Sequence, residues 1–415
     1  MRILWFSNTS SNFDIENQIG FSGGWISELE RNIVGVVEIE ELAVSFFYSC
    51  NKKVKRDKIT YYAIRRRERS NLFVKFIFNW IHFIGNKKDL KRCIKVVDDF
   101  KPDIIHVFGT ESVFGMIAKF YPDRTIIHLQ GLVNPILNAY FPPHISLFDV
   151  LWYGNWFNFI VGNGRFHDYL RFKLIAAREL EIFKDCKYYL GRTTWDRQYI
   201  NLLVPSAKYF YNSELLRVDF SSVQWKLSKN ELLTISTIIN SNLYKGLDLI
   251  LITSNVIKHT WGDRFIWHIF GINKTDEVVA IFENKLRLRF GDNNVVFHGS
   301  QPAKTLVDGL LCSDVFVHPS YIDNSPNSVC EAQLLGMPVI CTNVGGVGSL
   351  IETGRNGILI PANDPYYLAK MIIDIKKNDY MAHSLGAEAR KTAQIRHNTG
   401  DVINGIVSVY KDLCH

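Results

Sequence analysis

The chain has 415 residues, of which 47% are hydrophobic and 21% charged, and its formal net charge is +7. This composition excludes an intrinsically disordered protein and predicts a globular one, and the length favours two domains. The seven cysteines are scattered without a C-x-x-C pair, which favours buried free thiols in a reducing cytoplasm over a disulfide frame or a zinc site.

Short apolar runs alternate with helical patterns along the first half of the chain. The apolar run at residues 2–8 predicts a first strand and not a signal peptide. A glycine turn at Gly23 and Gly24 then precedes a helical pattern at 24–33. Further strands are predicted within 37–47, 103–109, 125–131 and 187–193, and a further helix within 112–121. This alternation is typical of a parallel sheet with crossover helices.

A basic segment runs from Lys52 to Arg69 and holds nine Lys and Arg residues against two acidic ones. Apolar side chains follow at helical spacing between Leu72 and Ile84. Residues 52–84 either dock on an anionic membrane surface or cover the first sheet as a helix beside a solvated charge run. No motif for reading bases accompanies this charge, so we expect no nucleic acid partner.

The longest apolar stretch, residues 145–164, is interrupted by Asp149 and by several asparagines and glycines. We therefore do not predict a transmembrane helix there. Its many aromatic residues either line an apolar binding groove or form an ordinary aromatic core patch.

A polar stretch at 217–232 predicts a linker, so we divide the chain into domains at 1–222 and 223–398. In the second half, strands are predicted within 232–237, 265–271, 294–299, 314–320 and 357–364, and helices within 246–258, 305–312 and 327–335. Two α/β halves of this kind bind ligands beyond the carboxyl ends of their strands, which points to the cleft between the halves.

Residues 323–351 combine a helix start with two carboxylates. Ser325 suits the N-cap and Pro326 the first helical position. A helix N-terminus at the carboxyl end of a strand predicts a diphosphate seat. Asp323 precedes the helix and Glu331 lies inside it, and carboxylates suit sugar hydroxyls. Spacing alone leaves open an ordinary strand–loop–helix unit in which Glu331 faces solvent.

The segment HPSYIDNSPNSVCEAQLLGMPVICTNVGGVGSLIETGRNGILIPANDP, residues 318–365, closely resembles the signature of the retaining glycosyltransferases of family 4, also called group 1. Weaker similarities, PDIIHVFGTE, YKGLDLIL and NVVFHG, follow in the family's order. The resemblance implies the α/β fold called GT-B, in which two doubly wound Rossmann-like domains face each other across a cleft. It also implies that a C-terminal helix, 399–415, packs back on the first domain.

By this resemblance, Asp323 contacts the transferred sugar, Glu331 the donor ribose and Lys245 the donor diphosphate. Two positions depart from the family. Asp323 stands where glutamate is usual, and Asn240 stands where an arginine usually accompanies the lysine, so Arg192 is a candidate to replace that contact. The remaining expected donor contacts are Ser325, Asn327 and Ser328, and Gly23 and Gly24 are expected to form a phosphate or acceptor loop.

The strand at 125–131 aligns Gln130 with a functional histidine of the family, so we expect Gln130 to take part in catalysis together with Asp323. His128 lies two residues earlier on the same strand face and is the alternative candidate. It is also a candidate core residue, and His106 is expected to be structural.

The resemblance implies a retaining, metal-independent hexosyltransferase without a cofactor. It would move a sugar from a nucleotide-diphosphate donor to a saccharide, lipid-linked acceptor in cell-envelope or capsular polysaccharide synthesis. The expected location is the cytoplasm, with peripheral attachment to the inner face of the cell membrane. The alternatives are a sugar-nucleotide 2-epimerase of the same fold and a non-catalytic sugar-nucleotide-binding protein, the latter because of Asn240 and Gln130.

Overall fold

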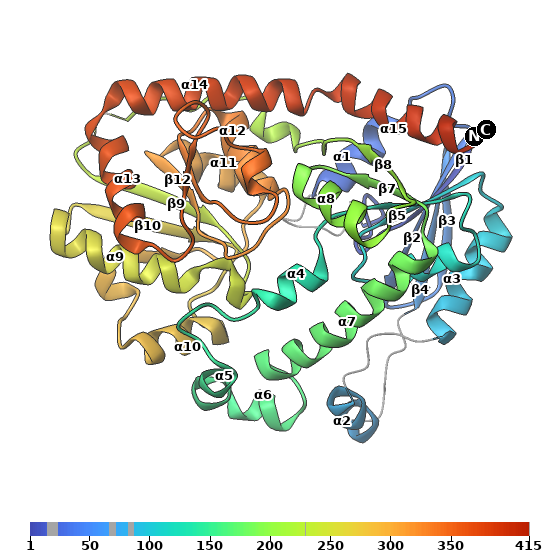
Figure 1. Ribbon diagram of the computed structural model, residues 1–415, viewed down its shortest axis with the longest axis horizontal. Coiled ribbons are helices and arrows are strands. Elements are labelled where there is room, and N and C mark those ends of the chain that lie inside the picture. Colours follow the sequence, from blue (N-terminus) through green and yellow to red (C-terminus); the bar gives the residue numbers. More distant parts are fainter. Residues whose placement is uncertain (15–23, 66–71, 82–86, 229, 415) are drawn as a thin grey trace.

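A computed structural model describes residues 1–14, 24–65, 72–81, 87–228 and 230–414. It contains two sheets with helices on both faces, one in each half of the chain (Figure 1). The predicted α/β class with two doubly wound domains is confirmed. Gly23 lies outside the described residues.

The first sheet has the strand order β3-β4-β2-β1-β5-β6-β7-β8. Its strands are β1 (Arg2–Phe6), β2 (Glu41–Tyr48), β3 (Lys52–Arg56), β4 (Ile59–Arg65), β5 (Ile104–Phe108), β6 (Thr125–His128), β7 (Tyr188–Gly191) and β8 (Lys208–Tyr211). Neighbouring strands are parallel except for β3, which is antiparallel to β4. The central strands are apolar because both faces are covered by helices; all five residues of β5 are buried.

The antiparallel edge strand corrects our interpretation of the basic segment. Most of the described part of this segment forms β3 and β4, and the basic side chains of β3 are exposed to solvent. Lys53 pairs with Asp99 at 2.6 Å and Lys55 with Glu41 at 2.6 Å, so part of the positive charge is balanced by the first domain itself. Lysines on an exposed edge strand also discourage pairing with another chain.

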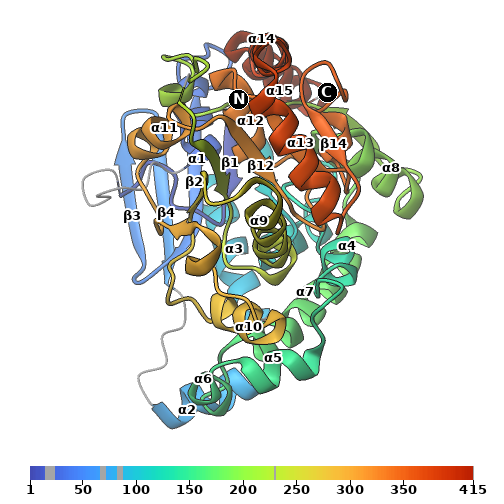
Figure 2. The same cartoon turned by 90° about the vertical axis from the view of Figure 1, so that its left-hand side faces the viewer.

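The helices of the first half are α1 (Gly24–Ile33), α2 (Leu72–Trp80), α3 (Lys87–Phe100), η1 (Val113–Lys119), α4 (Val133–Asn138), α5 (Leu147–Tyr153), α6 (Trp156–Ile160), α7 (Arg165–Asp185) and α8 (Thr194–Leu203). The predicted helix at 112–121 is the 3-10 helix η1. Helices α4, α5 and α6 lie away from the first sheet, and α5 packs against α10 (Glu277–Leu286) of the second half (Figures 1 and 2).

The second sheet is parallel and has the order β11-β10-β9-β12-β13-β14. Its strands are β9 (Leu233–Ile238), β10 (Phe265–Phe270), β11 (Val295–Phe297), β12 (Val315–His318), β13 (Val339–Thr342) and β14 (Ile358–Ile360). The helices of this half are η2 (Val218–Phe220), η3 (Leu243–Lys245), α9 (Leu247–Trp261), α10 (Glu277–Leu286), η4 (Gly291–Asn293), α11 (Ala303–Leu311), α12 (Asn327–Leu335), η5 (Val347–Ser349), α13 (Pro365–Lys377) and α14 (Asp379–Arg396).

The last helix, α15 (Thr399–Cys414), returns to the first half, where it contacts α1 and β5 (Figure 1). Its residue Tyr410 is fully buried and accepts a hydrogen bond from the indole of Trp5 at 3.0 Å. The two halves are thus joined by the 211–233 connection and by α14 and α15. Among the described helices, none combines the length and the apolar character that crossing a membrane requires.

Candidate active site

A cavity of about 570 Å³ lies between the two halves. It is bordered by the carboxyl ends of strands from both sheets, where α/β proteins bind ligands. Eight of the residues selected from the sequence line it: Gln130, Arg192, Asn240, Lys245, Asp323, Ser325, Asn327 and Ser328. The structure therefore brings together most of the predicted donor site, although its residues span nearly half of the chain.

Lys245 and Asp323 form an ion pair on the wall of this cavity, with Nζ 2.6 Å from Oδ2. His318, at the end of β12, lies 3.0 Å from the same oxygen. The turn that carries Lys245 is fixed by Gly246, which has φ +78° and approaches Pro319 so closely that a Cβ would lie 2.0 Å from the proline carbonyl oxygen. Only glycine fits there, so the glycine sets where the lysine lies.

The charges of this group are well defined. Burial alone would raise the pKa of Asp323, but Lys245 and His318 more than offset this and hold that pKa well below its usual range. Burial lowers the pKa of His318 in spite of the neighbouring carboxylate. At neutral pH the cavity wall therefore carries an ionised Asp323, which pairs with Lys245, and a neutral His318.

Helix α12 begins at the cavity without a side-chain cap. The predicted cap by Ser325 is wrong, because its hydroxyl donates to Glu214 at 2.7 Å and the N-cap position falls on Pro326. The first helical residues, Asn327 and Ser328, line the cavity. An uncapped helix start offers backbone N–H groups and the positive end of the helix dipole, which together bind anions.

The turn at Gly345 and Gly346 supports the loop that carries Asp323. The Gly346 amide donates to the Asp323 carbonyl at 2.9 Å. A Cβ at Gly345 would lie 2.1 Å from that carbonyl oxygen, and a Cβ at Gly346 2.5 Å from the carbonyl oxygen of Asn324. The two glycines let the turn lie directly against this loop.

Arg192 is 2% exposed and lies beside the cavity between the two halves. Its Nε lies 3.7 Å from Glu214 Oε2, and its guanidinium lies over the Trp25 ring at 4.1 Å. Its Nη2 has no hydrogen-bond partner, although it is buried beside the cavity. A buried, unsatisfied donor is costly, so this nitrogen is suited to an oxygen of a bound ligand.

Gln130 lies just beyond β6, with its side chain held in one orientation. Its Oε1 accepts a hydrogen bond from the Trp25 indole at 3.2 Å, whereas its Nε2 is buried and has no partner. The amide therefore presents a donor to the cavity. Gly24, which precedes Trp25 and begins α1, has φ +63° and open space at its Cβ position.

His128 is fully buried and does not line the cavity. Its Nδ1 lies 3.2 Å from His106 Nε2, and the Arg192 Nε donates to its Nε2 at 3.5 Å. His106 in turn contacts the Tyr410 hydroxyl of α15 at 2.6 Å. Burial, and secondarily Arg192, holds the pKa of His128 well below its usual range, so this histidine is a neutral positioning group for Arg192.

The structure does not bring Glu331 to the cavity. Its two carboxylate oxygens accept hydrogen bonds from Arg217 at 2.7 Å each, and the residue is 4% exposed. Helix α12 turns this position toward η2, which carries the neighbouring residues of Arg217. The solvent-facing alternative is wrong. A ribose contact remains a prediction that requires Glu331 to share its carboxylate with Arg217.

His318, which lines the cavity, was not singled out from the sequence, and neither was Glu111, which lies beside Gln130. Glu111 follows β5, and its Oε2 lies 2.0 Å from the position that a Cβ on Gly109 would take, next to Gln130 Cγ. The Asn8 side chain contacts the same oxygen at 3.5 Å. Burial, together with nearby Glu179, raises the pKa of Glu111 to about 7. In the sequence, the position of Glu111 after a predicted buried strand was the signal that could have identified it.

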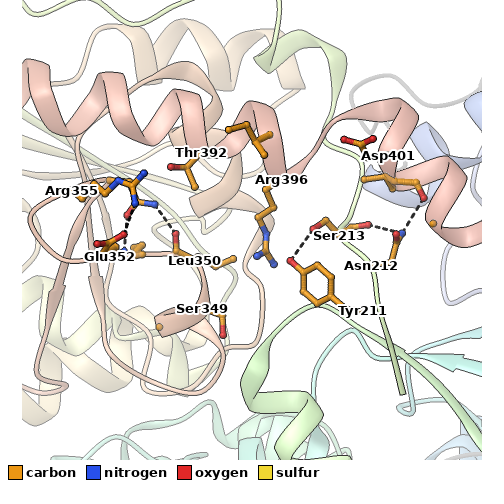
Figure 3. Close-up of a pocket in the computed structure, with 16 residues that line it drawn as sticks. Tyr211, Asn212, Ser213, Ser349, Leu350, Glu352, Arg355, Thr392, Arg396 and Asp401 are labelled. Carbon is orange, nitrogen blue, oxygen red and sulfur yellow. Dashed lines mark hydrogen bonds and ion pairs between the residues drawn. The ribbon is translucent and has the colours of Figure 1, made fainter. Parts of the chain in front are cut away.

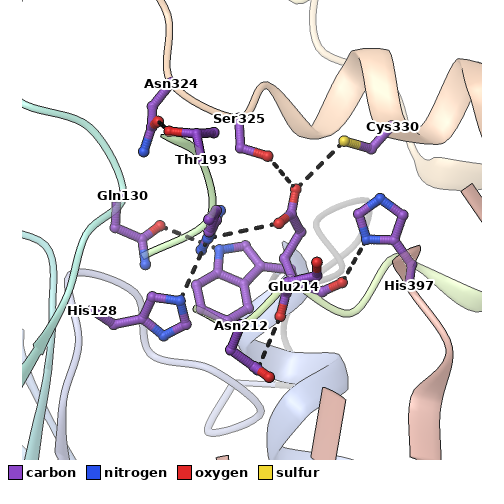
Figure 4. Close-up of polar contacts among 12 residues, drawn as sticks. His128, Gln130, Thr193, Asn212, Glu214, Asn324, Ser325, Cys330 and His397 are labelled. Carbon is purple, nitrogen blue, oxygen red and sulfur yellow. Dashed lines mark hydrogen bonds and ion pairs between the residues drawn. The ribbon is translucent and has the colours of Figure 1, made fainter. Parts of the chain in front are cut away.

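Glu214, Cys330 and His397 each present one ligand-type atom, and these atoms lie within 4.8 Å of one another (Figure 4). Arg192 already supplies a positive charge to Glu214, and burial raises the pKa of the Cys330 thiol well above its usual value. A neutral thiol beside an arginine is a poor cation ligand, so we assign no metal to this group.

A second cavity, of about 720 Å³, lies on the connection between the halves, between β8, η5 and the helices α14 and α15 (Figure 3). Arg396 borders it and donates to the Arg192 carbonyl at 2.6 Å, and Tyr211 and Glu352 line its sides. None of the residues selected from the sequence line it, so we place the candidate active site in the cleft cavity.

Comparisons with known proteins identify the family and the relatives that this chain resembles. Residues 220–392 match the family described as "Glycosyl transferases group 1". An uncharacterised 41.2 kDa protein of the cps region of Klebsiella pneumoniae is 24% identical over 322 residues, which cover 74% of this chain and 84% of the relative. TuaC of Bacillus subtilis, named as a glycosyltransferase of teichuronic acid biosynthesis, is 34% identical over 102 residues, 25% of this chain and 26% of that protein.

The same overall structure occurs in solved proteins. Sucrose-phosphate synthase from Thermosynechococcus elongatus superposes with a TM-score of 0.70 at 13% identity, covering 99% of this chain and 98% of the other. HepE of Anabaena, solved in complex with UDP and glucose, superposes with a TM-score of 0.65 at 15% identity, covering 100% and 99%. These likenesses establish the GT-B fold.

Proposed function

We propose that this chain, whose C-terminal domain belongs to the group 1 glycosyl transferases, moves a sugar from a nucleotide-diphosphate donor to a saccharide acceptor with retention of configuration. The observation that carries this proposal is the grouping of Lys245, Arg192 and the uncapped start of α12 around one cleft cavity. These three sources of positive potential suit a diphosphate, and the ionised Asp323 beside them suits sugar hydroxyls.

In the proposed reaction, the bond between the anomeric carbon of the sugar and the diphosphate oxygen breaks, and the acceptor hydroxyl oxygen bonds to that carbon on the same face. The leaving phosphate takes the hydroxyl proton. Lys245 and the backbone N–H groups of Asn327 and Ser328 stabilise the charge that develops on the leaving phosphate, so transfer proceeds without a bound metal. Gln130 donates its amide N–H to the sugar or the acceptor. Because an amide does not ionise near neutral pH, Gln130 orients the reactants and is not a general base.

We further propose that the acceptor is a lipid-linked saccharide used in cell-envelope or capsular polysaccharide synthesis, at the cytoplasmic face of the cell membrane. The relative in a cps region and the relative named for teichuronic acid biosynthesis support this setting. UDP-glucose is the first donor to test, because HepE has been solved with it.

The test compares how Lys245→Ala changes the binding of a nucleoside diphosphate and of the bare nucleoside. Since the lysine charge is directed at the phosphates, we expect loss of diphosphate affinity on the order of ten- to a hundredfold and almost none for the nucleoside. Calorimetry with UDP and uridine is the measurement. Lys258→Ala, a surface lysine paired with Asp263, is the control. Equal losses for UDP and uridine would remove Lys245 from the diphosphate site.

Glu111 favours a second candidate function, that of a sugar-nucleotide 2-epimerase. Such an enzyme needs acid–base groups in the first domain near the cleft, and Glu111 is a carboxyl group with a pKa of about 7 at that place. Incubation with the donor alone separates the two functions. An epimerase converts the donor without acceptor, whereas a transferase leaves the sugar configuration unchanged.

A further inference from the structure

Three short helices, α2, α5 and α6, form one end of the molecule (Figures 1 and 2). Each of them carries exposed aromatic side chains. The exposed fractions include 66% for Phe148, 62% for Trp152 and 71% for Phe157. We call this surface the aromatic pole and define it by Phe76, Trp80, Phe148, Trp152, Trp156 and Phe157. Single exposed apolar residues are ordinary, but a cluster of this size marks an interaction surface.

Polar contacts fix the helices of the aromatic pole to one another and to α10. The Trp80 indole donates to the Ile160 carbonyl at 3.0 Å, and the Asn79 amide donates to the Val161 carbonyl at 3.0 Å, so α2 is fixed to α6. Asp149 accepts a hydrogen bond from the backbone amide of Ser146, the N-cap residue of α5, and pairs with Lys285 of α10 at 2.8 Å. These polar contacts join α2 to α6 and α5 to α10, and the aromatic side chains of the pole remain exposed.

The part of the pole formed by α5 and α6 lacks charge on its exposed side. Between Leu147 and Ile160, Asp149 is the single ionisable acidic or basic residue, and it is buried and paired. A protein-binding surface normally surrounds its apolar centre with a polar rim. Tryptophan and phenylalanine on a short, uncharged helix face are instead suited to the boundary between lipid headgroups and acyl chains.

The charge of the neighbouring chain fits an anionic lipid surface. Residues 65–95, which contain α2, hold ten Lys and Arg residues against two acidic ones, a net charge of +8 compared with +7 for the whole chain. The net positive charge of the protein is therefore concentrated in the segment that carries part of the aromatic pole. Basic segments next to an apolar surface are attracted to anionic lipids.

We propose that the aromatic pole docks the protein on a membrane surface that contains anionic lipid. Helix α4 begins at Val133, three residues after Gln130 of the candidate active site, and the chain then leads to α5 of the pole (Figure 1). Docking at the pole holds the protein at the surface that carries a membrane-bound acceptor. The inference deepens the proposed function and depends on it only for the nature of the acceptor, since docking itself needs no sugar transfer.

The experiment uses the full chain and two triple variants. The pole variant is Trp152→Ser, Trp156→Ser and Phe157→Ser. The matched control carries Leu202→Ser, Tyr366→Ser and Tyr380→Ser, whose side chains are 76%, 73% and 83% exposed elsewhere. Co-sedimentation is measured with vesicles of phosphatidylcholine alone and with vesicles that also contain phosphatidylglycerol, at low and high salt.

We expect the wild type and the control to bind the phosphatidylglycerol vesicles at low salt, and the pole variant to lose more than about tenfold in bound fraction. Brominated acyl chains should quench tryptophan fluorescence of the wild type more than that of the pole variant. Equal binding of all three proteins would overturn the proposal. So would a concentration-dependent dimer without vesicle binding that the pole variant abolishes, because it would assign the pole to a second copy.

Donor binding keeps the two proposals apart. Calorimetry with UDP is done on the same proteins without vesicles, and unchanged affinity in the pole variant also shows that the variant is folded. Loss of vesicle binding with intact UDP binding supports the membrane surface. Vesicle binding by a protein that binds no nucleotide would support the docking surface and contradict the transferase.

Discussion

At the scale of single residues, Gln130 stands where the resemblance places a functional histidine, and its side chain gives a prediction. Trp25 holds the amide oxygen, which leaves the amide nitrogen as an unpaired donor beside the cavity. We expect Gln130→Ala to lower turnover by roughly ten- to a thousandfold, the effect of losing one or two transition-state hydrogen bonds. Gln130→His should retain activity, because histidine is the residue of the family. Steady-state kinetics with the donor selected by binding is the measurement.

Gln130→Glu keeps the shape of the side chain and removes the N–H donor, so it should behave like Gln130→Ala. His128→Ala serves as the comparison, since His128 is buried and acts on Arg192 and not on the cavity. Wild-type turnover in both Gln130→Ala and Gln130→Glu, with collapse confined to a folded His128→Ala, would move the functional position two residues back along β6.

Glu111 gives a prediction about pH. Its pKa in the folded protein is about 7, above the usual value, so the folded state holds its proton more tightly than the unfolded state. The contribution of this group to stability is complete below the unfolded pKa and is lost as the pH rises through about 7. Glu111→Gln should therefore stabilise the protein at alkaline pH, by about 2–3 kcal/mol, and change it little at acidic pH.

The measurement is thermal unfolding of the wild type and Glu111→Gln at several pH values, from acidic to alkaline pH. Glu40→Gln, at an exposed position, is the control. If the stability difference between the wild type and Glu111→Gln were the same at every pH, Glu111 would not titrate within the pH values measured.

At the scale of elements, the turn between η3 and α9 places Lys245. An alanine Cβ at Gly246 would meet the Pro319 carbonyl at 2.0 Å, whereas one at Gly354, which has a similar φ of +83°, meets nothing within 4 Å. Positive φ alone costs about 1–2 kcal/mol for a residue with a Cβ. Gly354→Ala should cost about this much, and Gly246→Ala more, because the turn must also shift.

The shift should also move Lys245, so Gly246→Ala is expected to lose affinity for UDP while Gly354→Ala keeps it. Urea unfolding and calorimetry on both variants check the two effects. If Gly246→Ala bound UDP as the wild type does, the close approach to Pro319 would not position the lysine.

The elements also show what a sequence can and cannot predict. The α12 unit was predictable, because Pro326, Gly336 and the apolar run between them act through local backbone preferences. The cap was not, because Ser325 donates to Glu214, which is 111 residues away in the chain. The antiparallel edge strand β3 was missed since its lysines resemble a solvated run, and their acidic partners Glu41 and Asp99 are distant in sequence.

The candidate site residues also differ in whether local sequence or distant packing determines their place. Asp323 and Lys245 were predictable from local motifs, and the fold then brought them within 2.6 Å. The pairing of Glu331 with Arg217 was not, because it depends on how η2 packs against α12. Short segments of sequence determine local turns and helix starts. The partner of a buried charge depends instead on how the two halves pack together.

At the scale of the whole molecule, Glu214 joins the two halves. It follows β8 of the first sheet, accepts from Ser325 of the second half at 2.7 Å, and its backbone carbonyl contacts His397 at 2.8 Å at the end of α14 (Figure 4). Burial by itself would raise the pKa of Glu214, but Arg192, His397 and Arg396 lower it to about 2. This carboxylate is ionised in the folded protein throughout the neutral and mildly acidic range.

We therefore expect Glu214→Gln to destabilise the protein by about 3–5 kcal/mol at neutral pH, because Arg192 is left as a buried charge without its main partner. A depressed folded-state pKa stabilises above the unfolded pKa, and this stability is lost as the pH falls toward about 2. The difference between the wild type and Glu214→Gln should then shrink on acidification. Urea unfolding at several pH values measures it, with Glu352→Gln as a control, since that carboxylate is 67% exposed and pairs with Arg355 on the surface. A difference that stayed constant down to acidic pH would mean that the buried carboxylate is not the charge that holds the two halves together.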